Sequence, residues 1–423
     1  MYASINNKTY TKLRDLSFSP QADITGAEIV INQLVVTIKT DDEIAIGQEV
    51  SLYDDRDQIW AKYWITDSDK YDEYSWKIVA QSFVLLLDRK KMPAKMYAGV
   101  SAASAIAEIM GSVSYRLDSS VSGTITGFAP EQSARERLQW VCFCLGAYVK
   151  TFFNDKIEIL DVGEDLTVIP LKKTFWKPSV SYDDYVTAIK LKLYTYRQGT
   201  PETTDKYVTV ESGGTEVYYI ETTQDITISN PNVPASVPEN IIEFNSVKLV
   251  NSTNASEIAS RLSTYYFMRM EVDAEIINNA EFKPAERLAV YLNEQTLVEG
   301  YMKTADFTFG TQAKAKIKLA QSRAIDAVAA VIRYLWDTTL ILAQTYYLPK
   351  NYGFSLQTQY LEKYMDDHRY VFYPEDDEAE GNTGTEGTTV EVQNELALDY
   401  YEGALVLYNV DECNFSNGVL DIE

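Results

Sequence analysis

The residues whose chemistry would mark a catalytic site are few in this chain of 423 residues. There is one histidine, His368, and it lies in the polar segment 366–370 (DDHRY). One imidazole excludes a histidine-rich metal site and leaves a single candidate for general-base catalysis by histidine. Because its neighbours are charged, we interpret His368 as a surface residue.

The three cysteines are Cys142, Cys144 and Cys413. The spacing of the first two, with one residue between them, fits neither a zinc knuckle nor a redox pair. We therefore expect the cysteines to be buried and to act as small apolar residues.

Carboxylates are plentiful, and a pair of them could catalyse glycoside hydrolysis. None lies in a recognisable catalytic setting, and the most conspicuous, Glu136, is explained below as a helix cap. The acidic segment around Asp376 lacks the ligand spacing of a calcium loop. Gly213-Gly214 lies between strand-like segments, unlike a phosphate-binding loop. The sequence therefore predicts no catalytic residue, no cofactor and no metal.

Strand-like segments fill the first part of the chain. Five of them recur between Ala22 and Asp88, at 29–31, 34–38, 50–53, 60–66 and 76–87. Polar turns such as 53–57 separate them. Closely spaced strands joined by polar turns favour a closed or nearly closed antiparallel barrel.

Two helices follow Met92-Pro93. Ser101 predicts the N-cap of a short helix that Gly111 ends, with an apolar face made of Ala105, Ile106, Ile109 and Met110. Segment 133–136 (SARE) has the capping-box pattern, and Leu138, Val141, Cys142 and Leu145 follow at helical spacing before Gly146. Segments 148–153 and 156–160 then predict a hairpin with a tight turn at Asn154-Asp155. These elements indicate a small α/β module.

Strand periodicity returns at 186–194, 207–210 and 217–220, and the Pro-rich segment 230–234 interrupts it as a loop. A helix follows, with Asn254 as its cap, Glu257 three residues later, and Ile258, Leu262 and Tyr265 on one face. Further strands are expected at 270–276, 288–292, 296–303 and 315–319. A second barrel with a helix against it is the simplest packing.

The part of the chain after residue 323 differs in composition and periodicity from the segments before it. Segment 324–347 predicts a long, largely apolar helix, which Arg333 and Asp337 interrupt and which is too short for a membrane span. Segment 374–384 has the composition of a solvated linker. Segment 396–410 predicts a last strand or hairpin.

Acidic side chains outnumber basic ones by 62 to 38, which gives a formal net charge of -24. Segment 364–423 contains sixteen carboxylates and one base, Arg369. Phosphate binding requires clustered Lys and Arg, so this balance argues against specific nucleic-acid binding. No run of ~18 apolar residues could span a bilayer, and the N-terminus lacks the apolar core of a secretory signal. We expect synthesis in a bacterial cytoplasm, with later exposure only through assembly.

Aromatic residues are abundant: 31 Tyr, 15 Phe and 6 Trp. They suit sheets and protein interfaces. Two sets of segments carry a family resemblance, namely 59–66 (IWAKYWIT), 76–80 (WKIVA) and 85–88 (LLLD), and then 133–140 (SARERLQW), 146–149 (GAYV) and 156–159 (KIEI). Together with the order barrel, α/β insertion, barrel and extension, they resemble the baseplate hub proteins of phages and the N-terminal part of tail-tip proteins of long-tailed phages.

The resemblance covers roughly residues 20–323 and implies a mainly β fold with an α+β insertion. The expected domains are a first tube-like antiparallel β-barrel (1–92), an α/β insertion (93–170), a second β-barrel with one helix (171–323), and an extension with a helix, an acidic linker and a terminal β segment (324–423). Where the family would have a Gly-Asp turn, this chain has the segment 284–287 (PAER).

The resemblance also implies a structural, non-enzymatic hub: a homotrimer whose six barrels form a ring that adapts a six-fold tail tube to a three-fold tip and lines the ejection channel. Its implied partners are the tail tube protein, distal tail or baseplate proteins, a spike or fibre protein and the tape-measure protein, in the tail tip of a virion or phage-like particle. We expect the following aromatic residues to pack the core or to make ring contacts: Trp60, Trp64, Trp76, Trp176, Tyr346 and Tyr347.

Two alternatives stay open at this point. The extension could be a receptor or carbohydrate binder, because Tyr346, Tyr347, Tyr352, Tyr370 and Tyr373 could stack on sugars. The chain could also be a tail-associated cell-wall hydrolase, although it lacks a catalytic setting for His or Cys.

Overall fold

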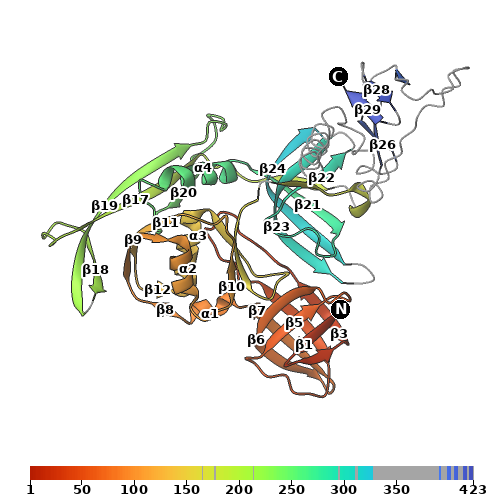
Figure 1. Ribbon diagram of the computed structural model, residues 1–423, viewed down its shortest axis with the longest axis horizontal. Helices are drawn as coiled ribbons and strands as arrows, with labels where there is room; N and C mark the ends of the chain where they lie inside the picture. The colour runs from red at the N-terminus through yellow and green to blue at the C-terminus, as the bar shows by residue number, and fades with distance from the viewer. Residues whose placement is uncertain are drawn as a thin grey trace, which may run out of the picture. The chain divides into compact units, whose positions relative to one another are not determined.

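The computed structural model describes residues 1–163, 165–175, 178–212, 214–293, 296–309 and 313–326, together with short strands beyond residue 389. The described elements are mostly strands, which confirms the mainly β fold (Figure 1). The chain divides into two compact units. The first comprises Met1–Asp165, Ser179–Leu288 and Gly300–Arg323, and the second comprises Leu166–Pro178, Ala289–Glu299 and Ala324–Glu423.

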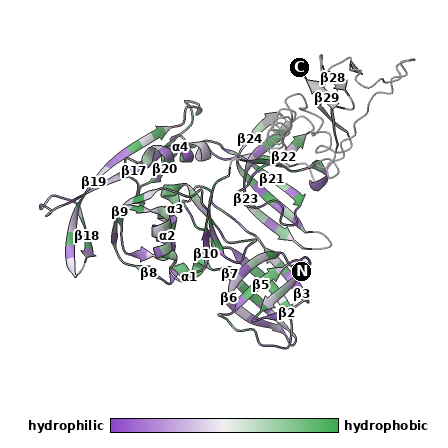
Figure 2. Ribbon diagram, in the orientation of Figure 1, coloured by the Kyte–Doolittle hydropathy of each residue, from purple (hydrophilic) through white to green (hydrophobic). Residues whose placement is uncertain are grey.

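Seven strands open the first unit. They are β1 (Tyr2–Ile5), β2 (Lys8–Tyr10), β3 (Leu13–Phe18), β4 (Gln33–Lys39), β5 (Glu49–Tyr53), β6 (Ile59–Asp72) and β7 (Ser75–Ser82), paired in the order β3-β4-β7-β6-β5-β1-β2. Hydrophobic and hydrophilic residues alternate along them (Figure 2). The predicted strands at 34–38, 50–53 and 60–66 are confirmed. Strands β1 to β3 were missed because they are short, with three to six residues each.

One predicted strand segment is wrong, and another is confirmed only in part: 76–82 lies in β7, but 84–87 is not a strand. Segment 29–31 is not a strand. Ile29 is buried in the core of the α/β module, and its carbonyl accepts a hydrogen bond from Arg135 Nη1 at 3.2 Å rather than from a neighbouring strand. Val84–Asp88 forms helix α1, with Val84 and Leu87 buried on one side. A short apolar run has no periodicity that separates a strand from a helical turn.

The α/β module contains β8 (Lys91–Met92), β9 (Lys95–Ser101), α2 (Ala102–Met110), β10 (Tyr115–Leu117), β11 (Thr124–Ala129), β12 (Gln132–Ser133), α3 (Ala134–Leu145), β13 (Ala147–Lys150) and β14 (Ile157–Asp161). Both predicted helices are confirmed, including the capping box of Ser133 with Glu136. Gly146 ends α3 in the left-handed conformation, with φ 74°. A Cβ there would lie 2.6 Å from Arg261 Nη1, the far end of a flexible side chain that can move aside, so the left-handed backbone is the main reason for glycine at this position.

The hairpin of β13 and β14 is confirmed, with Val149 opposite Ile159. Its turn is wider than predicted, because β13 ends at Lys150 and β14 begins at Ile157. The intervening residues include the buried Phe152 and Phe153, which has φ 53°. The tight turn at Asn154-Asp155 was therefore wrong: aromatic packing, not turn chemistry, shapes this connection.

The main sheet continues through the later strands β16 (Ser179–Tyr182), β21 (Met270–Ile277), β24 (Lys314–Asp326) and β23 (Thr296–Thr308), in the order β16-β21-β24-β23-β3. Phe307 of β23 pairs with Phe18 of β3. The strands from both strand-rich parts of the sequence are thus hydrogen-bonded in one sheet. Gln21, in the connection between β3 and β4, forms an isolated antiparallel bridge to Thr304 of β23.

A separate four-stranded sheet has the order β18-β19-β17-β20, where β17 is Ala188–Gln198, β18 is Tyr207–Ser212, β19 is Thr215–Ser229 and β20 is Ile241–Phe244. Helix α4 (Ala255–Tyr266) packs with β17 through the same hydrophobic core as the α/β module. Asn254 is the N-cap as predicted, but its side chain does not cap the helix. It donates instead to the Leu249 carbonyl at 3.1 Å.

In the second unit, β15 (Leu166–Val168) pairs with β22 (Arg287–Asn293) around a small core of Ala289, Tyr291 and Leu297. A 3-10 turn, η1, spans Leu171–Lys173. The short strands β26 (Leu398–Tyr401) and β27 (Ala404–Leu407) form the predicted terminal hairpin, and β25 (Val390–Glu391), β28 (Cys413–Ser416) and β29 (Val419–Ile422) pair with one another.

The long helix predicted at 324–347 is not confirmed. Its first three residues belong to β24, which runs to Asp326. Its other residues lie outside the described part of the chain, as does the acidic linker at 374–384.

Candidate interface surfaces

The predicted interface residues differ in their exposure. Trp60 is 2% exposed and lies in the interior. Trp64 is half-buried on β6, between the buried Tyr63 and Ile65, so it belongs to the outer face of that strand. Trp76 is half-buried at the start of β7. Trp176, Tyr346 and Tyr347 lie outside the described residues.

Trp60 is the centre of an aromatic cluster whose other members are Phe18, Phe153, Phe307 and Phe309. The Trp60 ring lies 4.8 Å from Phe307, 5.2 Å from Phe153 and 5.3 Å from Phe309, centroid to centroid and edge to face. The Trp60 carbonyl also accepts a hydrogen bond from the Phe153 amide at 2.8 Å. The cluster therefore joins the N-terminal strands to the β13–β14 connection and to β23.

A buried polar contact that was not predicted from the sequence is centred on the side chain of Asn32. Asn32 is 2% exposed, and its Nδ2 donates to the Gln21 carbonyl at 3.0 Å and to Thr151 Oγ1 at 2.9 Å. Its Oδ1 accepts from the Gln21 amide at 2.7 Å. These three hydrogen bonds fix the buried amide of Asn32 relative to both Gln21 and Thr151. The signal in the sequence was a polar residue just before an apolar strand.

The buried carboxylate of Glu158 has structural partners. It is 3% exposed and lies 2.8 Å from Lys150 Nζ and 3.2 Å from Arg116 Nε. Burial raises the pKa of Glu158, but the hydrogen bonds from Lys150 and Asn154, together with the positive charges of Lys150 and Arg116, outweigh that effect and lower the net pKa. A carboxylate held ionised between two cations stabilises the sheet and does not serve as a general acid.

The cysteines Cys142 and Cys144 are buried on α3, as predicted. Burial raises the pKa of each thiol to about 12, so neither is a thiolate at neutral pH. Within the described residues, no group of three or more His, Cys, Asp or Glu side chains is placed to hold a metal ion. His368 lies outside those residues. No described helix is both long enough and apolar enough to cross a bilayer.

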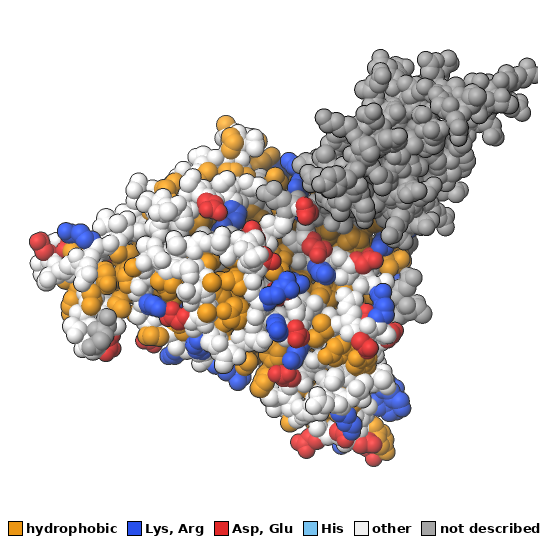
Figure 3. Space-filling model, viewed as in Figure 1, with side chains coloured by type: hydrophobic (Ala, Val, Ile, Leu, Met, Phe, Trp, Pro, Cys, Tyr) orange, Lys and Arg blue, Asp and Glu red, His pale blue; other side chains and the backbone are white. Residues whose placement is uncertain are grey.

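Exposed apolar side chains are the remaining candidates for function. Those of the first unit are Ile46, Tyr71, Tyr74, Tyr182, Tyr207 and Ile241, and those of the second unit are Leu171 and Phe175. On the face drawn in Figure 3, apolar side chains are interspersed with Lys, Arg, Asp and Glu. Of these, exposed tyrosine is a residue type that is enriched at protein interfaces.

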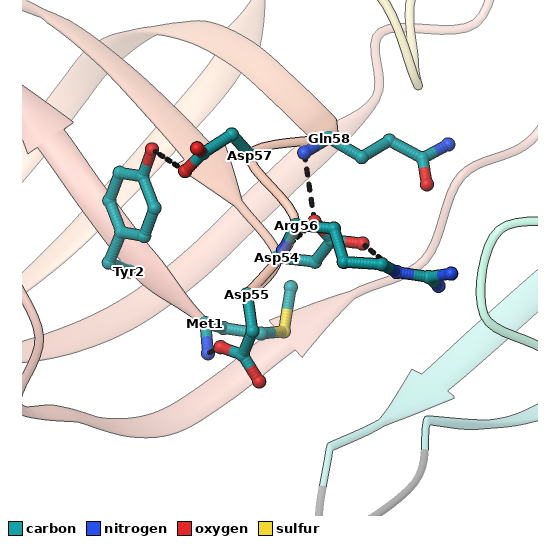
Figure 4. Close-up of polar contacts among 7 residues, drawn as sticks. All are labelled: Met1, Tyr2, Asp54, Asp55, Arg56, Asp57 and Gln58. Carbon is teal, nitrogen blue, oxygen red and sulfur yellow. Dashed lines mark hydrogen bonds and ion pairs between the residues drawn. The ribbon is translucent and has the colours of Figure 1, made fainter.

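One end of the N-terminal strands has its charges paired within the chain (Figure 4). The Met1 amino group pairs with Asp55, and Tyr2 Oη donates to Asp57 at 2.9 Å. Asp54 Oδ1 accepts from the amide of Gln58 at 2.8 Å, and the other oxygen lies 3.8 Å from Arg56 Nε. The negative charges in the loop between β5 and β6 are therefore largely balanced by the Met1 amino group, Arg56 and hydrogen-bond donors of the same chain.

Two solved structures share this fold. A tail protein from Neisseria meningitidis superposes with a TM-score of 0.54 at 8% sequence identity, over 75% of this chain and 95% of that chain. The 43 kDa tail protein of prophage MuSo2 from Shewanella oneidensis superposes with a TM-score of 0.50 at 9% identity, over 76% of this chain and 97% of that chain. The sequence matches no family model and no curated protein. The resemblance to phage tail proteins is thus confirmed at the level of the fold.

Proposed function

We propose that the protein is a structural component of the tail tip of a phage or phage-like particle, and that it acts as a baseplate hub. The observation that carries this proposal is the fold, which nearly the full length of two tail proteins shares with this chain. The described surface supports it, because exposed tyrosines suit contacts between proteins. We infer no catalytic activity, no cofactor and no metal.

The proposed assembly is a homotrimer. In it, each chain contributes two barrels, from segments 1–92 and 171–323, and the six barrels form a ring that adapts a six-fold tail tube to a three-fold tip. Strands of both segments are paired in one sheet, and each strand between the edge strands β16 and β2 has a neighbour on both sides, which limits the free edges open to uncontrolled association.

The charge of the protein supports a channel role. Three copies carry three times -24, or -72 formally, at neutral pH. A channel lined in part by carboxylates repels phosphate, so DNA passes without adhering. The same channel would pass the tape-measure protein.

The oligomeric state tests the proposal directly. Light scattering of the purified full-length protein should give three times the mass of the chain, and electron micrographs should show rings with a central hole. A stable monomer, alone or mixed with tail tube protein, would rule out the hub function.

The location tests it independently. Antibody labelling of particles from the producing bacterium should mark the tail tip, next to the tube, the distal tail or baseplate proteins and the spike or fibre. Label on the head, or only on free protein, would contradict the proposed role. Cell-wall zymography with the purified protein should show no clearing, and clearing would favour a hydrolase instead.

A further inference from the structure

Three exposed apolar side chains occur at one end of the N-terminal strands. Tyr71 and Tyr74 lie at the turn between β6 and β7 and are 64% and 51% exposed. Ile46, 60% exposed, lies in the loop between β4 and β5. We call residues 40–47 and 67–74 the hairpin end. Tyrosine that is more than half exposed on a rigid turn is typical of a contact residue at a protein interface.

The two segments of the hairpin end are held side by side by hydrogen bonds. The Thr40 amide donates to the Tyr74 carbonyl at 2.8 Å, and Ser68 Oγ donates to the Ile44 carbonyl at 2.6 Å. The Gly47 amide donates to the Ile65 carbonyl at 2.9 Å. The surface is therefore formed before any partner binds, which lowers the entropy cost of association.

The hairpin end is strongly acidic. It contains seven carboxylates and one base, Lys70. Asp42 pairs with Lys8, but the exposed side chains of Asp41, Glu43, Asp69 and Glu73 have no hydrogen bond and no ion pair within the described chain. The opposite end of β6 differs, because Met1, Arg56 and backbone amides neutralise its carboxylates (Figure 4).

We propose that the hairpin end binds a different tail protein, whose contact surface has Lys or Arg side chains around an apolar depression that receives Tyr71 and Tyr74. This inference rests on the proposed function, and it identifies one contact surface of the hub. Buried tyrosines supply the binding energy, and charge complementarity with the unpaired carboxylates aligns the partner and speeds its encounter.

The test uses two independent variants of the full-length protein. Tyr71→Ser/Tyr74→Ser removes the aromatic contacts, and Asp69→Lys/Glu73→Lys reverses the charge. The controls on β18 are Tyr207→Ser, at a tyrosine that is also 51% exposed, and Glu211→Lys, at an exposed carboxylate. Each variant replaces the natural gene in the producing bacterium, and thermal melts check that each purified variant is folded.

Copies of the protein per purified particle are then counted by quantitative mass spectrometry. Both hairpin-end variants should keep the wild-type oligomer mass by light scattering, yet be incorporated at least about ten-fold less. Both β18 controls should be incorporated normally. Normal incorporation of either hairpin-end variant would overturn the proposal.

Two further outcomes would distinguish a contact with a different protein from a contact between copies of this chain and from a failure of the hub proposal. A lower oligomer mass for the hairpin-end variants would place this surface between copies of the chain, and the proposal of a different partner would fail while the hub function stood. Absence of the wild-type protein from particles would overturn the hub function itself, and this inference with it.

Discussion

Trp60 shows how an aromatic residue that could serve an interface is instead used in the interior. Its ring contacts Phe153, Phe307 and Phe309, which come from two other parts of the chain. Trp64, four residues later on the same strand, lies on the outer face. Residues four apart lie on the same face of a regular strand, so spacing could not separate the two tryptophans. The pairing of β5 with β6 shifts register between Leu52 and Tyr53, opposite Trp60, and this irregularity puts the two rings on different faces.

Truncation of Trp60 tests this difference. We expect Trp60→Ala to lower the free energy of unfolding by about 3–5 kcal/mol, because it opens a cavity that four phenylalanine rings cannot fill. Trp64→Ala, from the half-buried outer face, should cost clearly less. Urea unfolding followed by circular dichroism measures both, and equal losses would contradict a central role for Trp60.

Glu158 predicts a pH dependence. Burial raises its pKa, but the hydrogen bonds from Lys150 and Asn154 and the positive charges of Lys150 and Arg116 outweigh that effect, so the pKa is lowered on folding. A carboxylate with a lowered folded pKa adds stability above its unfolded pKa and loses it as the pH falls through the folded pKa. Glu158→Gln should therefore destabilise the protein at pH 7, and the difference from wild type should shrink below about pH 4.

Thermal melts between pH 3 and pH 7 measure that difference. The matched control is Glu49→Gln, which removes an exposed ion pair with Lys62 and should have a small effect at every pH. A deficit of Glu158→Gln that stays constant down to pH 3 would show that Glu158 acts by packing rather than by charge.

The thiols give a third test at the residue scale. Because burial raises the pKa of Cys142 and Cys144 to about 12, native protein carrying Cys413→Ser should react very slowly with a thiol reagent at pH 8. The two cysteines should react fully in denaturant. Rapid reaction of the folded protein would mean that α3 is accessible.

At the scale of elements, the local sequence predicted where helices begin and end, but it did not predict which groups their cap side chains bond to. Helix α3 begins and ends where its capping box and glycine predict. Helix α4 begins at the predicted Asn254, yet the Asn254 side chain bonds to the preceding loop instead of the helix. The cap position is a local property, whereas the partner of a cap side chain depends on the chain around it.

The capping box can be tested by mutation. Ser133→Ala should cost about 1 kcal/mol, because it removes the acceptor for the Glu136 amide. Ser263→Ala lies in the interior of α4, where the hydroxyl bonds only to the Ser260 carbonyl, and should be close to neutral. Chemical unfolding of both variants measures the difference, and a neutral Ser133→Ala would contradict the cap.

At the scale of the whole molecule, charge dominates association. Each chain carries a formal charge of -24, so subunits repel one another before they meet. Salt screens this repulsion over a Debye length of about 8 Å at physiological ionic strength. The proposed trimer should therefore tighten as salt rises from about 10 mM to about 150 mM. Sedimentation at several protein concentrations measures this, and weaker association over that range would mean that attractive ion pairs hold the trimer.

The sequence by itself determined the mainly β fold, the α/β module, two capped helices and the buried cysteines. These features depend on periodicity, cap residues and apolar character, which are properties of neighbouring residues. Strands β1 to β3 were not predicted, because three to six residues are too few to establish a periodicity.

Only the tertiary structure decided how the parts join. It paired Phe18 with Phe307 across almost the whole described chain, gave Asn32 its partners in Gln21 and Thr151, and placed Tyr71 and Tyr74 in solvent. A contact between residues hundreds of positions apart depends on the packing of everything between them, and no local pattern in the sequence encodes it.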